Sequence, residues 1–440
     1  MKKILALLLA GMMTATALAG CGSGSTDNAT ANDQSKDAEA AKIDPSFPDA
    51  SLFGDETNIT LKVWAPDKAV SLVKTQVENF KKHYSSVKFN KIEVVAQGEN
   101  DAATNIVNDP EKAADVFGFP SDQLNKLKDA QVLTPVAPSM SASVTAYNNE
   151  STVKAATFKD NDGEFLYAFP ETNDNGYYLV YDNTVVTDAQ AGKLEDVLAA
   201  CKKAGKTFYF DCGNGFYSCV FAFTGGVKID GFEEDGETQK FVDYDENVAV
   251  DTLMAFAKLM KQYKGTFISD DVANISTGFT NGKIGAGVDG TWNSDPDKKA
   301  LGKKFGAAKL PTINVNGEDK QLVSMFGYKY IGVNSHSKFP NTSQILAYYL
   351  TGLDCQKERA TTLGWGPSNL EAQKAVADDP ILKAVSAQAE NAVAQVNIAG
   401  TFWSSMGTLG GEMYKDTWKA DDKAATKDLL KKTIAGVRDE

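Results

Sequence analysis

Residues 59–68 (ITLKVWAPDK), together with the segment that follows them, decide the fold class. The run 59–65 is typical of a strand. After it, apolar residues recur at three- and four-residue spacing, as the buried stripe of a helix requires; they are Val70, Val73, Val77, Phe80 and Tyr84. Further strands are predicted at 91–96 and 115–119. This strand-helix-strand order predicts a parallel, doubly wound α/β sheet.

A second α/β unit is predicted beyond residue 167. Residues 166–170 and 177–181 have the pattern of extended chain, and the polar stretch 171–176 (ETNDNG) between them is interpreted as a turn at a domain boundary. The remaining predicted elements are helices at 194–204 and 248–263 and strands at 207–211, 284–288 and 328–333, followed by a mainly helical C-terminal part. The chain is therefore expected to form two α/β units.

Composition favours binding over catalysis. The 440 residues are 42% hydrophobic and 23% charged, and 45 Lys and Arg against 58 Asp and Glu give a net charge of -13, which argues against a nucleic-acid partner. With two histidines and five cysteines, and without the P-loop or the common hydrolase and zinc motifs, we expect no cofactor and no metal. A pair of carboxylates, as in glycoside hydrolases, stays open as a catalytic alternative.

The N-terminus has the layout of a secretory signal. Three residues, Met-Lys-Lys, precede the uncharged stretch 4–20, which ends in Leu18-Ala19-Gly20-Cys21. That tetrapeptide resembles the lipobox of bacterial lipoproteins, so Cys21 is predicted to carry the lipid; an uncleaved membrane-spanning helix is the alternative. We predict a signal peptide at 1–21, a disordered tether at 22–56 and anchoring at the extracellular face of the cell membrane.

Four further cysteines lie in the exported part of the chain. They are Cys201, Cys212, Cys219 and Cys355, of which Cys212 and Cys219 are close enough in sequence to form a disulfide. Buried free thiols are the alternative for the pair.

Aromatic residues fall where the predicted strands end. Trp64, Phe119 and Trp292 close three strands, and Phe216 and Tyr217 follow a fourth. In open α/β sheets, ligands bind beyond the carboxyl ends of the strands, although any single ring could equally fill the core. Rings combined with nearby carboxylates and amides suit a carbohydrate, whose C–H face packs on rings while its hydroxyls form hydrogen bonds.

From about Thr60 to the C-terminus, these landmarks resemble the extracellular solute-binding proteins of ABC importers, in particular the maltose/maltodextrin-binding type. The segment 63–68 (VWAPDK) is similar to the family's first strand and loop, which implies that Asp67 and Lys68 bind sugar hydroxyls. The segment 115–123 (DVFGFPSDQ) resembles one that carries a stacking tryptophan and an Asp-Arg pair, at positions occupied here by Phe119, Asp122 and Gln123.

The resemblance implies further ligand contacts. Glu171 matches a glutamate of the hinge segment, and the family's second-lobe glutamate and tyrosine fall at residues 214–217 (NGFY), where the glutamate is missing and Phe216 and Tyr217 remain. The turn 289–292 (DGTW), the segment 401–403 (TFW) and the loop 364–368 (GWGPS) match family segments, which adds stacking residues: Trp292, Trp403 and Trp365.

The implied architecture is a two-lobe fold of the periplasmic-binding-protein type, with a hinge and a central cleft. The expected N-terminal lobe is 57–171 and 324–372 and the expected C-terminal lobe is 176–312 and 380–440, with crossings at 171–176, 312–323 and 369–380. The implied function is capture of maltose, maltotriose or longer α-glucan oligosaccharides by a monomer, through hinge closure, and delivery to an ABC permease. The alternatives are another oligosaccharide or a peptide as ligand, or a surface glycoside hydrolase.

Overall fold

The computed structural model describes residues 46–160, 163–233 and 238–438. The predicted signal peptide, the lipidation site Cys21 and the tether up to residue 45 lie outside the described residues. Across the described ranges, no helix is both long enough and apolar enough to cross a membrane.

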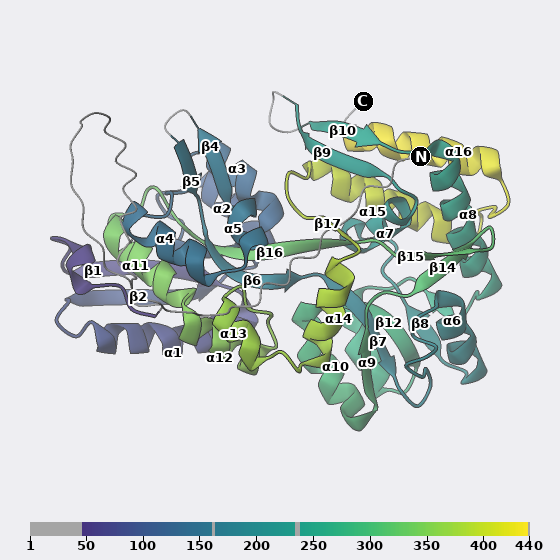
Figure 1. The fold of residues 1–440 in the computed structure, drawn as a ribbon, viewed down its shortest axis with the longest axis horizontal. Helices are drawn as coiled ribbons and strands as arrows, with labels where there is room; N and C mark the ends of the chain where they lie inside the picture. Colours follow the sequence, from purple (N-terminus) through teal and green to yellow (C-terminus); the bar gives the residue numbers. More distant parts are fainter. Residues whose placement is uncertain (1–45, 161–162, 234–237, 439–440) are drawn as a thin grey trace, which may run out of the picture. The chain divides into compact units, whose positions relative to one another are not determined.

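The first lobe is built on a mixed sheet (Figure 1). Its strands in spatial order are β17 (Ala392–Ala394), β16 (Ser324–Val333), β3 (Val116–Pro120), β1 (Ile59–Ala65) and β2 (Phe89–Ala96), with β6 (Phe169–Asn175) also paired to β16. Its helices are α1 (Asp67–His83), α2 (Glu99–Asn108), α3 (Leu124–Asp129), α4 (Pro138–Tyr147), α5 (Glu150–Ala155), α11 (Pro340–Leu350), α12 (Leu353–Leu363) and α13 (Leu370–Ala375), and β4 (Thr157–Asp160) and β5 (Gly163–Leu166) form a hairpin.

The second lobe has its own sheet and its own apolar core. The strands in spatial order are β11 (Phe267–Ile268), β8 (Thr207–Tyr209), β12 (Ile284–Gly290), β7 (Tyr177–Asp182) and β13 (Phe305–Ala308). The helices are α6 (Leu194–Lys203), α7 (Gly215–Thr224), α8 (Glu246–Gln262), α9 (Ile275–Thr280), α10 (Ser294–Leu301), α14 (Pro380–Ala389), α15 (Gly400–Tyr414) and α16 (Lys423–Arg438), and two hairpins are formed by β9 (Lys228–Phe232) with β10 (Gln239–Asp243) and by β14 (Thr312–Val315) with β15 (Glu318–Gln321).

The two predicted α/β units are confirmed, but their sheets are not wholly parallel. Strands β2, β1 and β3 are parallel, as are β11, β8 and β12. In contrast, β16 runs antiparallel to β3, and β7 runs antiparallel to β12. Strand β16 is also antiparallel to β6, and β7 is also antiparallel to β13. Both β16 and β7 lie next to a crossing, since β6 leads directly into β7 and β16 follows β15. Figure 1 shows β6 and β16 side by side where the chain passes between the lobes.

The polar stretch 171–176 is a strand rather than the predicted turn, because β6 extends through it to residue 175. Most of its polar side chains are buried, and two of them bond to distant segments. Asp174 accepts a hydrogen bond from the N–H of Gly366, and Asn175 donates to Gln395 over 2.6 Å. Such long-range partners satisfy the polar groups without a turn, and their positions cannot be read from a local pattern.

The crossings differ in detail from the predicted lobe boundaries. The hairpin of β14 and β15, within the predicted crossing 312–323, packs on α6 and α8 of the second lobe, so the chain leaves that lobe only after Gln321. Strand β17, within the predicted second-lobe segment 380–440, pairs with β16 in the first sheet. The chain therefore touches the first sheet once more before α15 begins.

The last part of the predicted tether is folded, which corrects the expected boundary at residue 56. The ring of Phe47 stacks on His83 with centroids 3.7 Å apart. The short 3-10 helix Ala50–Phe53 follows, and Phe53 is 2% exposed. Residues 46–56 therefore belong to the first lobe, because their aromatic rings close its core next to α1.

The four described cysteines are free and buried. They are Cys201, Cys212, Cys219 and Cys355. Burial raises the pKa of all four thiols, so they are held in the protonated form. The sequence left a disulfide and two free thiols open for Cys212 and Cys219, and in the structure both are free thiols.

Candidate ligand-binding cleft

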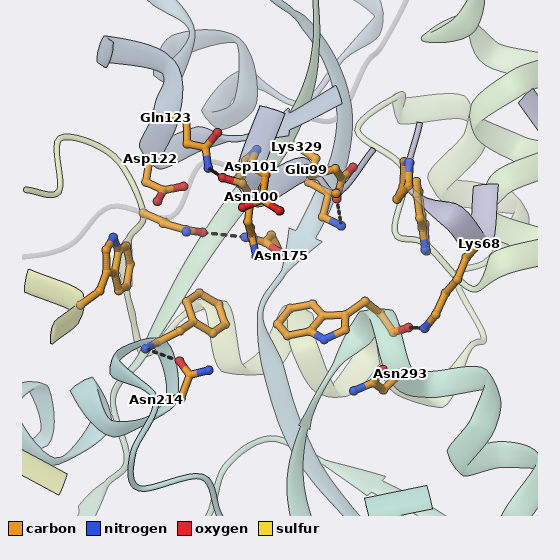
Figure 2. A pocket seen from close by; sticks show the side chains of 18 of the residues that line it. Lys68, Glu99, Asn100, Asp101, Asp122, Gln123, Asn175, Asn214, Asn293 and Lys329 are labelled. Carbon is orange, nitrogen blue, oxygen red and sulfur yellow. Dashed lines mark hydrogen bonds and ion pairs between the residues drawn. The ribbon is translucent and has the colours of Figure 1, made fainter. Parts of the chain in front are cut away.

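A cavity of about 730 Å³ lies between the two lobes, a size within the range of small-molecule sites. It is lined by Pro66, Asp67, Lys68, Gly98, Glu99, Asn100, Asp101, Pro120, Asp122, Gln123, Asn175, Asn214, Phe216, Tyr217, Trp292, Asn293, Lys329, Trp365, Gln395 and Trp403. Figure 2 shows the acids and amides of the first lobe on one side and Asn214 and Asn293 of the second lobe on the other. We call these sides the first-lobe wall and the second-lobe wall.

The second-lobe wall is aromatic. Phe216 and Tyr217 begin α7, Trp292 lies in the 3-10 helix Thr291–Asn293 after β12, and Trp403 lies in the first turn of α15. The centroid of the Phe216 ring is 5.7 Å from that of Trp292 and 6.2 Å from that of Trp403. Three chain segments thus bring one cluster of rings to the cavity, with Phe216 between the two tryptophans.

Close backbone packing holds this cluster in place. Asn214 caps α7 by accepting the N–H of Phe216 over 3.0 Å. The next residue, Gly215, lies so close to the backbone of Trp403 that a Cβ there would collide with the Trp403 carbonyl group. A residue without a side chain is therefore required where α7 meets α15, and this contact sets Phe216 beside Trp403.

The first-lobe wall is polar and follows the carboxyl ends of three parallel strands. Asp67 and Lys68 come after β1, residues 98–101 come after β2, and Asp122 and Gln123 come after β3. This is the edge at which open α/β sheets place ligands. Gln123 is already oriented, because its side-chain nitrogen donates to the carbonyl of Asn100 over 2.7 Å.

Two charged groups of the first-lobe wall are paired with each other. Lys329, in the middle of β16, forms an ion pair with Glu99 over 2.7 Å and lies 4.9 Å from the centre of the Trp365 ring. Burial works to lower the pKa of Lys329, but Glu99 and the buried acids Asp174 and Glu171 outweigh it and raise the pKa. Lys329 therefore remains a cation at the end of the cavity beside Trp365.

Lys68 and Asp122 have different surroundings. The ammonium group of Lys68 donates to the main-chain carbonyl of Trp292, a direct contact between the two walls. Burial lowers the pKa of Lys68, against the opposing attraction of Asp289. Burial raises the pKa of Asp122 to about 6, and its Oδ1 has no hydrogen-bond partner among the described residues. Asp122 thus offers an unused oxygen in the first-lobe wall.

Nine of the twelve predicted ligand-binding residues line this one cavity. They are Asp67, Lys68, Asp122, Gln123, Phe216, Tyr217, Trp292, Trp365 and Trp403. They come from segments up to 336 residues apart, between Asp67 and Trp403, and the fold brings them together. Their contacts with a ligand stay a prediction.

Two predicted rings lie away from the cavity lining. Trp64 is inside β1, paired with Val95 and Phe117 of the neighbouring strands, and packs half-buried on the first-lobe core. Phe119 is inside β3, fully buried, with its ring 5.9 Å from that of Tyr330. The expected edge position fails for both because each ring belongs to the last residue but one of its strand, and its side chain packs on a face of the sheet instead of beyond the strand end.

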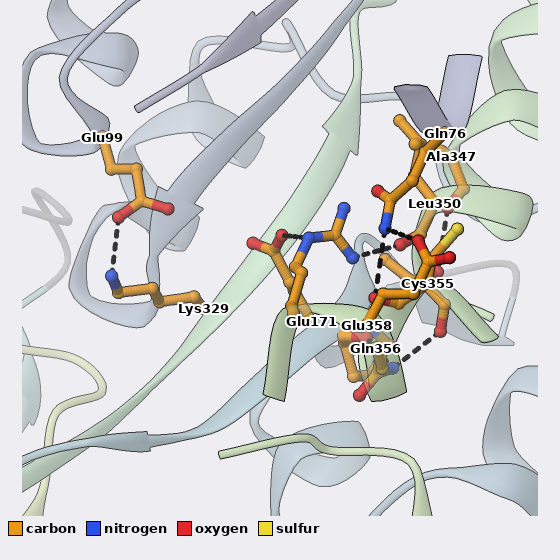
Figure 3. Close-up of polar contacts among 12 residues, drawn as sticks. Gln76, Glu99, Glu171, Lys329, Ala347, Leu350, Cys355, Gln356 and Glu358 are labelled. Carbon is orange, nitrogen blue, oxygen red and sulfur yellow. Dashed lines mark hydrogen bonds and ion pairs between the residues drawn. The ribbon is translucent and has the colours of Figure 1, made fainter. Parts of the chain in front are cut away.

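Glu171 also lies away from the cavity lining. It is buried and forms an ion pair over 3.1 Å with the guanidinium of Arg359, which is 2% exposed and also donates to the carbonyl of Leu350. Figure 3 shows Glu171 close to Leu350 and separate from the pair of Glu99 and Lys329. Its predicted place facing the ligand is therefore corrected to a structural position beneath the first-lobe wall.

Several lining residues were missed by sequence reasoning. They are Pro66, Gly98, Glu99, Asn100, Asp101, Pro120, Asn175, Asn214, Asn293, Lys329 and Gln395. The polar residues 98–101 after β2 and the single charge of Lys329 within an apolar strand could have been recognised in the sequence as candidate lining residues. No sequence pattern identifies Asn175 and Gln395 as lining residues, since they are 220 positions apart and meet through a hydrogen bond in the folded chain.

Among the described residues, no group of three or more His, Cys, Asp and Glu side chains is placed to hold a metal ion. The groups that the cavity lining offers to a ligand are aromatic rings, amides, carboxylates and two lysines.

Known structures share this fold. A protein solved with acarbose is 25% identical with a TM-score of 0.76, covering 87% of this chain and 99% of the other. The maltodextrin-binding protein MalE1 of L. casei BL23 is 26% identical with a TM-score of 0.73, covering 87% and 100%. The maltotriose-binding protein of Thermus thermophilus is 19% identical with a TM-score of 0.70, covering 86% and 99%, and this likeness concerns the fold alone.

Sequence comparison points to one family. A search of curated protein sequences gave no match. The family model described as bacterial extracellular solute-binding protein matches residues 75–384, more than half of the chain, and its members bind solutes outside the cytoplasm. With its two α/β lobes and the cavity between them, the chain belongs to the bacterial extracellular solute-binding proteins.

Proposed function

We propose that this protein captures maltose, maltotriose or longer α-glucan oligosaccharides in the cleft and delivers them to the permease of an ABC importer. The observation that carries the proposal is the contrast between the two walls of the cavity of about 730 Å³: four aromatic residues of the second lobe line one side, and acids and amides of the first lobe line the other. The 26% identical L. casei structure, named as a maltodextrin-binding protein, supports the choice of ligand.

Each wall suits one part of a sugar. A pyranose ring has apolar C–H faces that pack on aromatic rings, which assigns Trp292, Phe216 and Trp403 as stacking surfaces. Its hydroxyl groups donate and accept hydrogen bonds, which assigns Asp67, Asp122 and the amides as their partners. A ligand that contacts both walls binds the closed arrangement more tightly, and this difference in affinity shifts the lobes towards closure.

The remaining parts of the proposal concern location and chemistry. The protein acts as a monomer on the extracellular face of the membrane, anchored by a lipid on Cys21. It binds the sugar without cleaving it and uses no cofactor. In support, Glu99 in the cavity is neutralised by its ion pair with Lys329, and Glu171 is held by Arg359 outside the cavity, so neither is placed as a free catalytic acid.

The test is a tryptophan-fluorescence titration of the purified protein with maltose, maltotriose and maltotetraose. Cellotriose and a tripeptide serve as controls for linkage and for ligand class. Saturable changes with the α-glucans only are expected, because Trp292 and Trp403 line the cavity. A response to the controls but to no α-glucan would replace the proposed ligand and leave the family assignment intact. Shorter products after incubation with maltotriose would favour the glycoside hydrolase.

A further inference from the structure

The turn that carries Trp292 is a place where the second lobe contacts the first. This turn joins β12 to α10. On one side of it, Thr291 donates its hydroxyl to the main-chain carbonyl of Asp174 over 2.9 Å. On the other side, the main-chain carbonyl of Trp292 accepts a hydrogen bond from the ammonium group of Lys68, which Figure 2 shows. The turn is therefore bonded to the first lobe through two of its residues.

The two bonds lie at different places relative to the hinge. Asp174 belongs to β6, which leads into β7 and is paired with β16 where the chain passes between the lobes. Lys68 is the second residue of α1, which follows β1, and β3 separates β1 from β16 in the sheet. A rotation of the lobes about the crossing strands can keep the bond to Asp174, whereas opening the cleft has to break the bond to Lys68.

The loop that follows α12 also reaches this turn. Gly364 has a φ of +70°, and a Cβ there would lie 3.0 Å from Oγ of Ser294, the first residue of α10. The next residue of the loop is the lining residue Trp365. The two lobes thus pack closely at the turn, and the bond from Lys68 is part of a continuous contact between them.

The charges around Lys68 attract it towards the second lobe. Burial lowers the pKa of Lys68, and Lys329 of its own lobe lowers it further. Asp289, Asp295 and Asp297, all of the second lobe, act in the opposite direction and favour the ammonium form. The attraction therefore comes from across the cleft and the repulsion from the lobe to which Lys68 belongs.

We infer that Lys68 is a positioning residue: its bond to the Trp292 carbonyl is a latch that favours the closed cleft and fixes the turn bearing the stacking ring. Its contribution to sugar affinity then comes through Trp292 and the closure of the lobes. The resemblance to the family implied a different role, a bond from Lys68 to a sugar hydroxyl. The inference rests on the proposed function only for the choice of test ligand.

Loss of the latch shifts the population towards the open form. A hydrogen bond of ordinary strength changes the ratio of closed to open molecules about fivefold. The affinity for a ligand that needs the closed form falls by at most the same factor. A direct contact with the sugar could lower the affinity as much, but it would leave the ligand-free protein unchanged.

The experiment combines small-angle X-ray scattering with maltotriose titrations. It compares the wild type, Lys68→Met, Lys68→Arg and the control Lys74→Met, which removes an exposed lysine of the same helix. Methionine at position 68 removes the donor, and arginine keeps a charged donor. Without sugar, Lys68→Met should have a larger radius of gyration than the wild type, and with saturating maltotriose the two radii should agree. Its affinity should be about fivefold weaker. Lys68→Arg and Lys74→Met should match the wild type in both measurements.

Two results would overturn the inference. One is a Lys68→Met variant with the wild-type radius of gyration in the absence of sugar, because any loss of affinity would then come from a direct contact with the ligand. The other is a Lys68→Arg variant that is as expanded and binds as weakly as Lys68→Met, because its charged donor is retained.

The scattering measurement without sugar separates this inference from the proposed function. If no α-glucan binds to the wild type but Lys68→Met is expanded, the proposed ligand fails and the latch stands. If maltotriose binds but Lys68→Met is not expanded, the latch fails and the proposed ligand stands.

Discussion

The two walls of the cleft differ in how they are built. The first-lobe wall consists of short turns after parallel strands, and two of its charged groups, Glu99 and Lys329, are paired with each other. The second-lobe wall consists of rings from α7, α15 and the turn after β12, brought together by close backbone packing at Gly215. From this comparison we expect the second lobe to supply most of the binding free energy and the first lobe to supply selectivity.

The largest expected effect concerns the structure beneath the first-lobe wall. Replacing Glu171 by Gln would leave Arg359 buried without its carboxylate, so we expect the free energy of unfolding to fall by about 3 kcal/mol. Maltotriose affinity of the folded fraction should be unchanged, because Glu171 does not line the cavity. Urea denaturation and a titration on the same preparation measure the two quantities. Lost affinity with unchanged stability would restore Glu171 as a ligand contact.

Trp403→Ala tests the second-lobe wall directly. Removing a ring that packs on the sugar should cost about 2 kcal/mol of binding free energy, or about thirtyfold in Kd. Trp418→Phe, which changes a second-lobe tryptophan outside the cavity lining, is the matched control and should bind as the wild type does. Calorimetry avoids the loss of the fluorescent reporter. An unchanged Kd for Trp403→Ala would mean that the cleft is assigned wrongly.

Asp67→Ala is the corresponding test of the first-lobe wall, with a smaller expected effect. Loss of one hydrogen bond to a sugar hydroxyl should weaken maltotriose binding by about 1 kcal/mol, or about fivefold. Asp109→Ala, an exposed acid whose ion pair with Lys112 is on the surface of the same lobe, is the control. If Asp67→Ala cost more than Trp403→Ala, the proposed division between the walls would be reversed.

An effect of the same small size is expected from the response of Asp122 to pH. Burial raises the pKa of Asp122 to about 6 in the folded protein, whereas the carboxyl group of the unfolded chain loses its proton near pH 4. The bound proton therefore stabilises the folded state at low pH, and this contribution to the free energy of unfolding is lost as the pH rises through 6. Asp122→Asn should match the wild type at pH 4 and be more stable at pH 7.5 by about 1 kcal/mol, a modest figure because partial exposure screens the charge. Thermal unfolding at both pH values measures it, and a variant that is less stable at pH 7.5 would contradict the assignment.

The sequence patterns predicted the elements well and the placement of side chains less well. The apolar stripe after Ala65 predicted α1, and the predicted strand ends indicated that Asp67, Asp122 and Trp292 lie at the cavity. Both predictions succeeded because helical periodicity and strand ends are local properties of the sequence. Trp64 and Phe119 were misplaced because each is the last residue but one of its strand, and the local pattern does not show what the face of the sheet to which its ring points packs against.

Long-range contacts account for the remaining differences. The stretch 171–176 forms a strand since its polar side chains find partners such as Gly366 and Gln395, far away in the sequence. No local pattern carries that information.

A crystal structure of the protein with maltotriose tests the central claim most directly. We expect glucose units packed on Trp292 and Trp403, with hydroxyl groups bonded to Asp67 and to Asp122. A sugar bound elsewhere on the protein, or bound in the cleft without contact to either tryptophan, would contradict the account.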